Sequence, residues 1–259
     1  MESRNSDGEI VGKTMEKFIE CVMNVSEGRD SCKLEKIVSQ IESFPDAFLL
    51  DCAADSAHHR TVVTFMGTPK SVLGAAFSAV QAAVELIDLR IHRGVHPRMG
   101  AVDVIPFTPL RGVSMAECVN VAEQLGQKIA INLGVPVYLY GEAARRLDRS
   151  ELSQVRRGGF EHLEKLISID PDRSPDFGEN RLHPSAGATA VGARDFLIAY
   201  NVYLKTAELS VARKIAENIR ESGGGLPGVR ALGFYIDHKG LAQISMNITD
   251  YKKTSLDEV

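Results

Sequence analysis

The stretch RIHRGVHPRMGAVDVIPFTP (residues 90–109) joins a polar, cationic segment to an apolar run. Its first eleven residues contain two histidines, three arginines and two glycines, and the AVDVIPF that follows is apolar and β-leaning. This change of character predicts a loop that leads into a buried strand. Because titratable and cationic side chains gather where that strand begins, the loop is the first candidate for chemistry.

The residues before this stretch alternate between strand and helix patterns. KFIECVM (17–23), AFLLDCA (47–53) and RTVVTFMG (60–67) are short apolar runs typical of strands. Helices are predicted from Leu34 to Ile41, and from Pro69 to near Arg90 with Thr68 as the cap. The predicted order is therefore strand, helix, strand, strand, helix.

The residues after it continue the alternation and then change. Ser114 and Glu117 form a capping box that opens a helix through Ile131, which Gly134 and Pro136 stop, and PVYLY (136–140) is the next strand. Residues 141–167 have the pattern of short, charged helices. Residues 170–190 are rich in Pro, Gly, Ser and Asp, which predicts a long binding loop or a linker.

A second unit follows this loop. DFLIAYNVYL (195–204) is a predicted strand, residues 207–221 a helix, and residues 229–237 and 241–250 two strands joined at HKG as a hairpin. The order β-α-β-β thus recurs in both halves. We expect an α/β (α+β) fold of two similar subdomains, each a mixed sheet covered by helices.

The expected boundaries are a disordered tail over residues 1–16, an N-terminal subdomain with its connecting loop over 17–190, and a C-terminal subdomain over 191–259. The final TSLDEV resembles only the first turn of a helix, so the second subdomain is expected to be incomplete. A frayed tail is the alternative, and sequence does not decide whether Val259 is the natural end.

Composition excludes several classes of function. The chain has 259 residues, 44% of them hydrophobic, a net charge of -4 and a pI near 6.0, so nucleic acid is not an expected partner. No apolar run is long enough for a signal peptide or a membrane span, which predicts a cytoplasmic protein without membrane contact. The four cysteines lack CxxC spacing, which predicts buried free thiols.

Two histidine pairs raise the question of a metal. His92 and His96 are four residues apart, but Gly94 and Pro97 break the helix that would present both to one ion. His58 and its neighbour His59 lie close in sequence to two aspartates, so a zinc or manganese cluster stays open there.

Acid–base chemistry is the competing interpretation of the loop. Histidine exchanges protons near neutral pH, and arginines beside His96 would favour its neutral, proton-accepting form. Five arginines near predicted strand or helix ends also suit a carboxylate ligand, although a solvated surface is the alternative for each: Arg60, Arg90, Arg93, Arg98 and Arg111. The amides of NVSEGRD (24–30) offer a further anion site.

The chain resembles the glutamate formiminotransferases, including the transferase half of the formiminotransferase-cyclodeaminases. The resemblance is carried by ECVMNVSEGRD, RTVVTFMG, ELIDLRIHRGVHPRMGAVDVIPF, LGVPVYLYGEAA and PDFG followed by HPSAGATAVGARDFL, and spans roughly residues 17 to 250. It implies transfer of a formimino group from N-formimino-L-glutamate to tetrahydrofolate in histidine degradation, by two similar α/β subdomains with a substrate channel between them.

The resemblance also implies roles for individual residues. His96, in the HPRMGA block, is implied as the catalytic acid–base residue, and tetrahydrofolate as a co-substrate with no metal required. Arg98, Arg60, Asn24 and Asp51 are the expected substrate-binding residues. The loop expected to bind folate comprises Gly178, Glu179, Asn180, Arg181, Leu182, His183, Pro184, Ser185, Ala186 and Gly187. A homodimer is expected, because a partner chain would cover an unfinished sheet edge.

Four departures from the family's pattern qualify this reading. Met23 replaces a usual proline, Ala53 an acid found in many members, Val95 a glutamate, and Ala186 a tryptophan found in some. The loss of an acid at Ala53 matters most, since that acid is a candidate partner for the histidine or the substrate amine. The alternatives are a folate-binding relative without turnover, a glutamate formyltransferase acting on 5-formyltetrahydrofolate, and a metal-dependent hydrolase.

Overall fold

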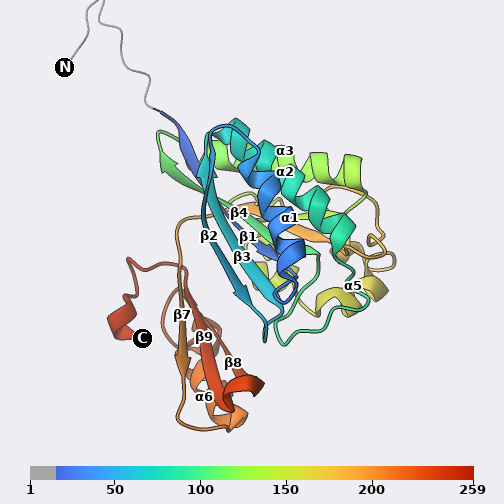
Figure 1. Ribbon diagram of the computed structural model, residues 1–259. Coiled ribbons are helices and arrows are strands. Elements are labelled where there is room, and N and C mark those ends of the chain that lie inside the picture. Colours follow the sequence, from blue (N-terminus) through green and yellow to red (C-terminus); the bar gives the residue numbers. More distant parts are fainter. Residues whose placement is uncertain (1–15) are drawn as a thin grey trace, which may run out of the picture.

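A computed structural model describes residues 16–259, and the tail expected over 1–16 therefore lies, but for its last residue, outside the described residues (Figure 1). The strands are β1 (Phe18–Val25), β2 (Ala47–Asp55), β3 (Arg60–Gly67), β4 (Val102–Arg111), β5 (Val137–Gly141), β6 (Thr189–Ala193), β7 (Ile198–Tyr203), β8 (Val229–Ile236) and β9 (Leu241–Ile248). The helices are α1 (Ser31–Glu42), α2 (Pro69–Leu86), α3 (Met115–Leu133), α4 (Leu152–Val155), α5 (Gly159–Leu166) and α6 (Leu209–Ile219).

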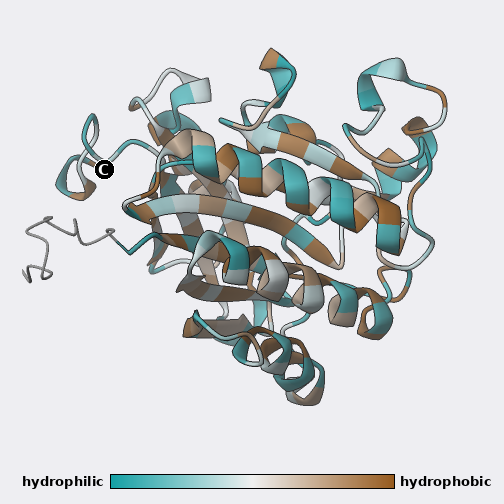
Figure 2. Ribbon diagram, turned by 90° about the horizontal axis from the view of Figure 1, so that it is seen from above, coloured by the Kyte–Doolittle hydropathy of each residue, from teal (hydrophilic) through white to brown (hydrophobic). Residues whose placement is uncertain are grey.

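The first unit is a six-stranded sheet in the order β2-β3-β1-β4-β6-β5. The strands β2, β3, β1 and β4 pair antiparallel, and β6 pairs parallel with both β4 and β5. Helices α1, α2 and α3 lie side by side over one face (Figure 1). Seen from above, these helices carry alternating hydrophilic and hydrophobic bands, as expected of helices with one buried side (Figure 2).

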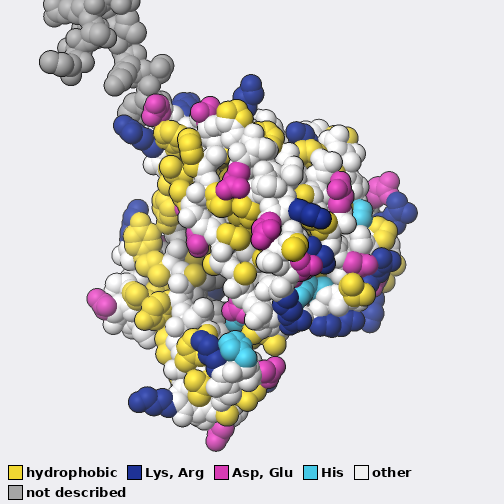
Figure 3. All heavy atoms as spheres, in the orientation of Figure 1, with side chains coloured by type: hydrophobic (Ala, Val, Ile, Leu, Met, Phe, Trp, Pro, Cys, Tyr) yellow, Lys and Arg dark blue, Asp and Glu magenta, His cyan; other side chains and the backbone are white. Residues whose placement is uncertain are grey.

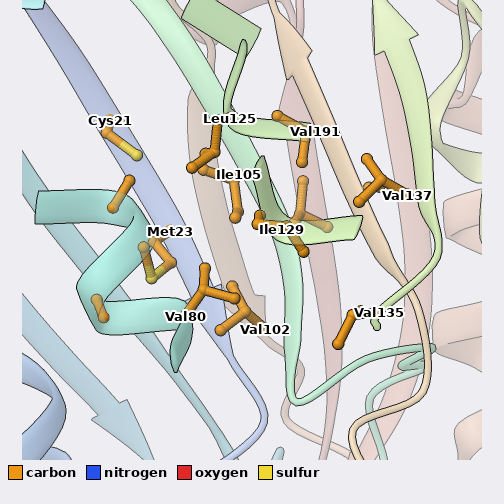
Figure 4. Close-up of a cluster of buried hydrophobic side chains, with 14 of the residues drawn as sticks. Cys21, Met23, Val80, Val102, Ile105, Leu125, Ile129, Val135, Val137 and Val191 are labelled. Atoms are coloured by element: carbon orange, nitrogen blue, oxygen red, sulfur yellow. The ribbon is translucent and has the colours of Figure 1, made fainter. Parts of the chain in front are cut away.

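The main core fills the space between this sheet and its helices. Met23, Ile105, Leu125, Ile129 and Val191 are buried there, contributed by β1, β4, α3 and β6 (Figure 4). Along β1 and β3 every second residue is buried, so these strands turn one set of side chains to the helices. The opposite face of the sheet lies away from these three helices, and we call it the site face.

The predicted helix ends are confirmed. The Thr68 side chain accepts a hydrogen bond from the Ser71 amide and Pro69 is the first residue of α2. At the start of α3 the Ser114–Glu117 capping box is formed, and Gly134 ends the helix with a left-handed φ of 64°. Local sequence therefore determines these ends.

One strand of the first sheet was not predicted. β6 (Thr189–Ala193) lies between β4 and β5, whereas the sequence suggested a loop up to residue 190 and a second unit from 191. The expected boundary thus falls inside a strand of the first unit, and the second unit starts with β7. The cause is composition: TAVGA is buried throughout but consists mostly of small residues, which give no strand signal.

The second unit has the predicted β-α-β-β order, in β7, α6, β8 and β9. Its three strands form an antiparallel sheet in the order β7-β9-β8, with α6 packed on it (Figure 1). The prediction of two similar helix-covered α/β units is confirmed, the first sheet being mixed and the second wholly antiparallel. The described chain ends in a short 3₁₀ turn, Leu256–Glu258, capped by Ser255.

All four cysteines are free, as predicted. Cys21 and Cys118 are buried, and burial raises the pKa of both thiols. Cys32 and Cys52 are exposed, so the expectation of burial was wrong for these two. Within residues 16–259 no helix is both long enough and apolar enough to cross a lipid bilayer.

Candidate active site

Two segments far apart in sequence meet just before β3 begins. The turn between β2 and β3 carries His58 and His59, and the loop between α2 and β4 packs directly on it. His92 Nε2 donates to the His59 carbonyl oxygen at 2.9 Å. A Cβ at Gly94 would lie 2.4 Å from the His58 carbonyl oxygen, so only glycine allows this approach. This contact brings His96 next to the β2–β3 turn.

The polar contacts of the His96 ring define its protonation. Its Nδ1 lies 2.7 Å from the Pro97 carbonyl oxygen, and Arg60 Nη1 lies 2.7 Å from Nε2 and 3.3 Å from Nδ1. The carbonyl can only accept and the guanidinium can only donate. We therefore assign the proton to Nδ1 and an unprotonated lone pair to Nε2.

Charge supports the same assignment. Burial, together with the guanidinium charges of Arg60 and Arg156, lowers the pKa of His96 to about 2. The imidazole is thus neutral across the physiological range, as the sequence predicted for a histidine among arginines. A neutral Nε2 can accept a proton.

A β-bulge places the second of these arginines. The register of β1 against β4 shifts between Asn24 and Val25, so Asp103 has no partner in the β1 ladder. The buried Asp103 carboxylate accepts from the Met99 amide at 2.7 Å and from Arg156 Nη1 at 3.0 Å. The bulge therefore anchors Arg156 and the residues that follow His96.

Asn24, Asp51 and Arg60, all predicted to bind substrate, lie on the site face. Asn24 pairs with Val62 in the sheet, and Asp51 and Arg60 are on the same side as Val62 through their register positions. Arg60 contacts His96 directly, Asn24 Nδ2 donates to the Val22 carbonyl, and Asp51 is exposed. The face can hold a polar ligand, and the binding roles of these residues stay predictions.

Arg98 is engaged elsewhere. Its Nη1 and Nη2 donate to the Glu161 carboxylate at 3.0 and 2.9 Å, and its Nε donates to His92 Nδ1 at 3.1 Å. These contacts fasten the loop to α5 and hold His92 as a neutral Nε2–H tautomer. They give the predicted substrate contact of Arg98 no support, and that role stays a prediction.

The loop predicted to bind folate, residues 178–187, docks at its C-terminal end beside the His96 loop. The amides of Ala101 and Ala188 donate to Ala186 and Met99, each at 2.8–2.9 Å. Gly187 has a φ of 71°, and a Cβ there would lie 2.2 Å from the Met99 carbonyl oxygen. The loop thus joins the segment that follows His96, while its folate contacts stay a prediction.

The anion site suggested for NVSEGRD is occupied by the Glu27 carboxylate of the same segment. Glu27 Oε1 accepts the amides of Gly28, Arg29 and Asp30 at 2.9, 2.9 and 3.1 Å. Burial raises the pKa of Glu27, but these hydrogen bonds and the nearby His59 outweigh it and lower the pKa. The amides at this turn are satisfied by the chain's own carboxylate.

The second unit contributes an aromatic ring that the sequence did not single out. Phe234 of β8 stacks on the His96 ring, with centroids 6.2 Å apart and planes at 28°, and meets the His58 ring edge-on at 5.4 Å. No local signal marks this phenylalanine, because its partners lie more than 130 residues away in the chain. Arg156 was missed for the same reason.

A pocket of about 480 Å³ opens beside this contact. It is lined by Arg29, Ser56, Ala57, Arg93, Gly94 and Val95 of the first unit and by Asp237 and His238 of the second. In the space-filling view the smaller unit lies below the larger, and Lys and Arg side chains gather at the lower edge of the larger unit near α5 (Figure 3). The surroundings suit an anionic ligand.

The histidine pairs do not assemble into a metal centre in the described part of the chain. His58 contacts Asp55, whereas His59 Nε2 faces Glu27 Oε1 at 3.5 Å. Among residues 16–259 no group of three or more His, Cys, Asp or Glu side chains is arranged to hold a metal ion.

Known proteins resemble this chain over nearly its whole length. The glutamate formimidoyltransferase of Thermoplasma acidophilum is 45% identical over 240 residues, which cover 92% of this chain and 79% of the relative. That of Streptococcus pyogenes serotype M1 is 43% identical, covering 93% and 81%. The formimidoyltransferase-cyclodeaminase of Sus scrofa is 44% identical over 95% of this chain but only 46% of its own length.

Two family models divide the chain where the structure does. The formiminotransferase domain, N-terminal subdomain, matches residues 18–194, and the formiminotransferase domain matches residues 199–259. The break between them falls between β6 and β7, after the last strand of the first sheet. This chain belongs to the formiminotransferase domain family.

Proposed function

We propose that this protein transfers a formimino group from N-formimino-L-glutamate to tetrahydrofolate, giving 5-formiminotetrahydrofolate and L-glutamate in histidine degradation. Relatives named glutamate formimidoyltransferase support the reaction class. The observation that carries the proposal is the neutral His96 imidazole, held against Arg60 on the site face and covered by Phe234 from the second unit. This is the residue to which the sequence resemblance assigns acid–base catalysis.

The charges around His96 suit these substrates. Both substrates carry carboxylates, and guanidinium groups bind carboxylates with paired hydrogen bonds. Arg60 Nη1 lies 2.7 Å from His96 Nε2 and its charge lowers the pKa of this ring, so a substrate carboxylate that pairs with Arg60 offsets that charge and makes Nε2 a stronger base. Binding of the anion and activation of the base are then one event.

The proposed reaction begins with addition of the folate N5 to the amidine carbon of the donor. A carbon–nitrogen bond forms, the π bond between the amidine carbon and its second nitrogen opens with its electron pair going to that nitrogen, and N5 loses its proton to His96 Nε2. A correctly placed general base contributes about 10²- to 10⁴-fold to the rate. Holding two substrates in register supplies much of the remainder.

The remaining assignments follow from position. Folate is proposed to lie against residues 178–187, which dock beside the His96 loop, with Asn24, Asp51 and Arg60 on the site face contacting substrate. We also propose that the protein is cytoplasmic and a homodimer. The dimer is supported by the outer edge of β7, with which no strand of residues 16–259 pairs, and light scattering would test it.

A second candidate is a folate-binding relative without turnover. Ala53 favours it, because this residue lies on the site face between Asp51 and Asp55 and offers no carboxylate there. Transfer of a formyl group from 5-formyltetrahydrofolate to glutamate is a third candidate that would use the same face.

The test is an assay of purified protein with N-formimino-L-glutamate and tetrahydrofolate, monitored for 5-formiminotetrahydrofolate. His96→Asn is expected to lower kcat/KM by about 10²- to 10⁴-fold, because the base is lost. His162→Gln, at an exposed histidine of α5, is the matched control and should leave the rate unchanged.

Three outcomes would change the assignment. Folate binding without product would favour the inactive relative. Product only from 5-formyltetrahydrofolate and glutamate would identify formyl transfer. Full activity of His96→Asn would show that His96 is not the base, while the proposed reaction would stand.

A further inference from the structure

The turn between β2 and β3 holds a carboxylate–imidazole pair. Asp55 Oδ1 accepts the His58 backbone amide at 2.8 Å, and Asp55 Oδ2 lies 2.8 Å from His58 Nδ1. One carboxylate therefore fixes both the backbone and the ring of His58. A carboxylate on Nδ1 keeps a proton on that atom and leaves Nε2 as the atom that exchanges protons.

The His58 ring is largely buried, but in the described part of the chain only one of its two nitrogens is hydrogen-bonded. Its side chain is 9% exposed, and within residues 16–259 its Nε2 has no hydrogen-bond partner. The two nearby rings are His96, with centroids 6.0 Å apart, and Phe234, which meets it edge-on. The His58 ring, held by Asp55, therefore lies beside the ring of the proposed base and contacts the same phenylalanine of the second unit.

The spacing between the two imidazoles is fixed by backbone contacts. The His92 hydrogen bond to the His59 carbonyl and the close approach of Gly94 to the His58 carbonyl lock the two segments together. Such a pair is held ready before any substrate arrives, which is what a catalytic pair requires.

The proposed reaction needs a second proton transfer, to a different nitrogen from the first. N5 of folate loses a proton, whereas the nitrogen of the departing glutamate must gain one. Burial, Arg60 and Arg156 lower the pKa of His96 to about 2, so in the free site His96 is neutral and its Nε2 carries no proton to give. Arginine side chains stay protonated in proteins, so neither Arg60 nor Arg156 supplies this proton.

Asp55 places a carboxylate against the His58 ring. Burial raises the pKa of Asp55, but hydrogen bonds from the His58 amide and ring outweigh it and lower the pKa, so the carboxylate stays charged. The His58 ring thus contacts an anion, whereas the His96 ring lies against the Arg60 guanidinium. Titratable groups with such different neighbours can take separate acid and base roles.

We propose that His58, oriented by Asp55, is the second acid–base catalyst of this site and protonates the nitrogen of the departing glutamate. In this step the bond between the amidine carbon and the glutamate nitrogen breaks. Its electron pair goes to that nitrogen, which takes a proton from Nε2 of His58 in its doubly protonated form, and the second amidine nitrogen re-forms its double bond to carbon. His58 is then neutral, and proton exchange with solvent restores His58 and His96. Asp55 is a positioning residue. This inference rests on the proposed function.

The first experiment compares His58→Gln, Asp55→Asn and the control His162→Gln with the wild type. His58→Gln is expected to lower kcat by about 10²- to 10⁴-fold while KM changes little, because the acid acts on the leaving group and not on binding. Asp55→Asn is expected to lower kcat by a smaller factor and to abolish the Nδ1–H tautomer of His58, which nitrogen-15 NMR of the imidazoles reports. A purely structural Asp55 would leave that tautomer unchanged.

The second experiment changes the leaving group. An N-formimino arylamine bearing a carboxylate releases a weakly basic amine, which departs without prior protonation. The loss caused by His58→Gln should shrink on this donor, whereas the loss caused by His96→Asn should persist. An equal loss of kcat in His58→Gln on both donors would overturn the role of His58 as the acid.

The outcomes separate the two proposals. Product from the wild type together with wild-type kcat in His58→Gln would overturn the role of His58 alone. No product from the wild type would overturn the proposed function, and this role with it. Thermal melts check that the variants are folded, and Asp55→Asn, whose side chain is 49% exposed, decides the question if His58→Gln does not fold.

Discussion

The two units share a topology but differ in how much they bury. In the first, β1, α1, β2 and β3 form the strand order β2-β3-β1, and in the second, β7, α6, β8 and β9 form the order β8-β9-β7, with antiparallel pairing throughout. The repeat seen in the sequence as an order of elements is thus a repeat of topology. In the first unit β4 covers the outer edge of β1, whereas among residues 16–259 no strand pairs with the outer edge of β7.

The cores of the two units differ accordingly. The first contains large buried side chains such as Phe65, Phe107 and Leu125. The second is built on Ala212, Ala216, Ala231, Ala242, Ile244 and Met246. On the α6 side of the second sheet Tyr200 is 45% exposed. One topology thus serves as a rigid scaffold in the first unit and as a lightly packed cover in the second.

The largest expected effect is in the first core. Phe107→Ala removes a fully buried ring from β4, between β1 and β6, and should lower the free energy of unfolding by about 3–5 kcal/mol in denaturant titration. Phe48→Ala, on the edge strand β2 where the side chain is 50% exposed, is the matched control and should cost far less. Similar losses in both variants would contradict the scaffold role of this core.

A smaller and more local effect is expected in the second core. Met246→Ala, at a side chain 5% exposed, should cost about 2 kcal/mol, near the low end for such truncations, because its small neighbours leave a shallow core. Amide hydrogen exchange should accelerate in β7, β8 and β9 and stay unchanged in β1, β3 and β4. Leu232→Ala, 46% exposed on the opposite side of the sheet, is the control. Faster exchange in both sheets would mean that the units unfold together.

Sequence predicted well what local chemistry controls. The cap at Thr68, the capping box at Ser114 and the stop at Gly134 each depend on a few neighbouring residues, and each is formed. The alternation of β1 and β3 is also visible locally, since one side of each strand faces the core. His96 was found because proline and arginines surround it in the chain.

The sequence did not predict the features that depend on contacts between residues far apart in the chain. β6 is a strand because β4 and β5 pair with it, and its small residues carry no strand preference of their own. Asp103 holds Arg156 because a bulge turns it away from the β1 ladder, and Phe234 reaches His96 from another sheet. His58 was considered only as a metal ligand, because its pairing with Asp55 depends on the shape of the turn.

The smallest expected change in stability is at the contact between the units, and it tests how the second unit serves the site. Arg230 of β8 donates from Nε and Nη2 to Glu151, just before α4, at 3.0 and 2.7 Å, and from Nη1 to Glu221 of its own unit at 2.5 Å. Both side chains are partly exposed, so Arg230→Gln should change the free energy of unfolding by less than about 1 kcal/mol, and less at high salt. It should nevertheless shift the NMR signals of the His58 and His96 rings, because Phe234 lies on the same strand and its ring current acts on both.

Arg146→Gln, which breaks a pair within the first unit, should leave these signals in place. Unchanged signals in Arg230→Gln would show that Phe234 is held over the histidines without this ion pair, and the second unit would then be a firmer part of the site than its small core suggests.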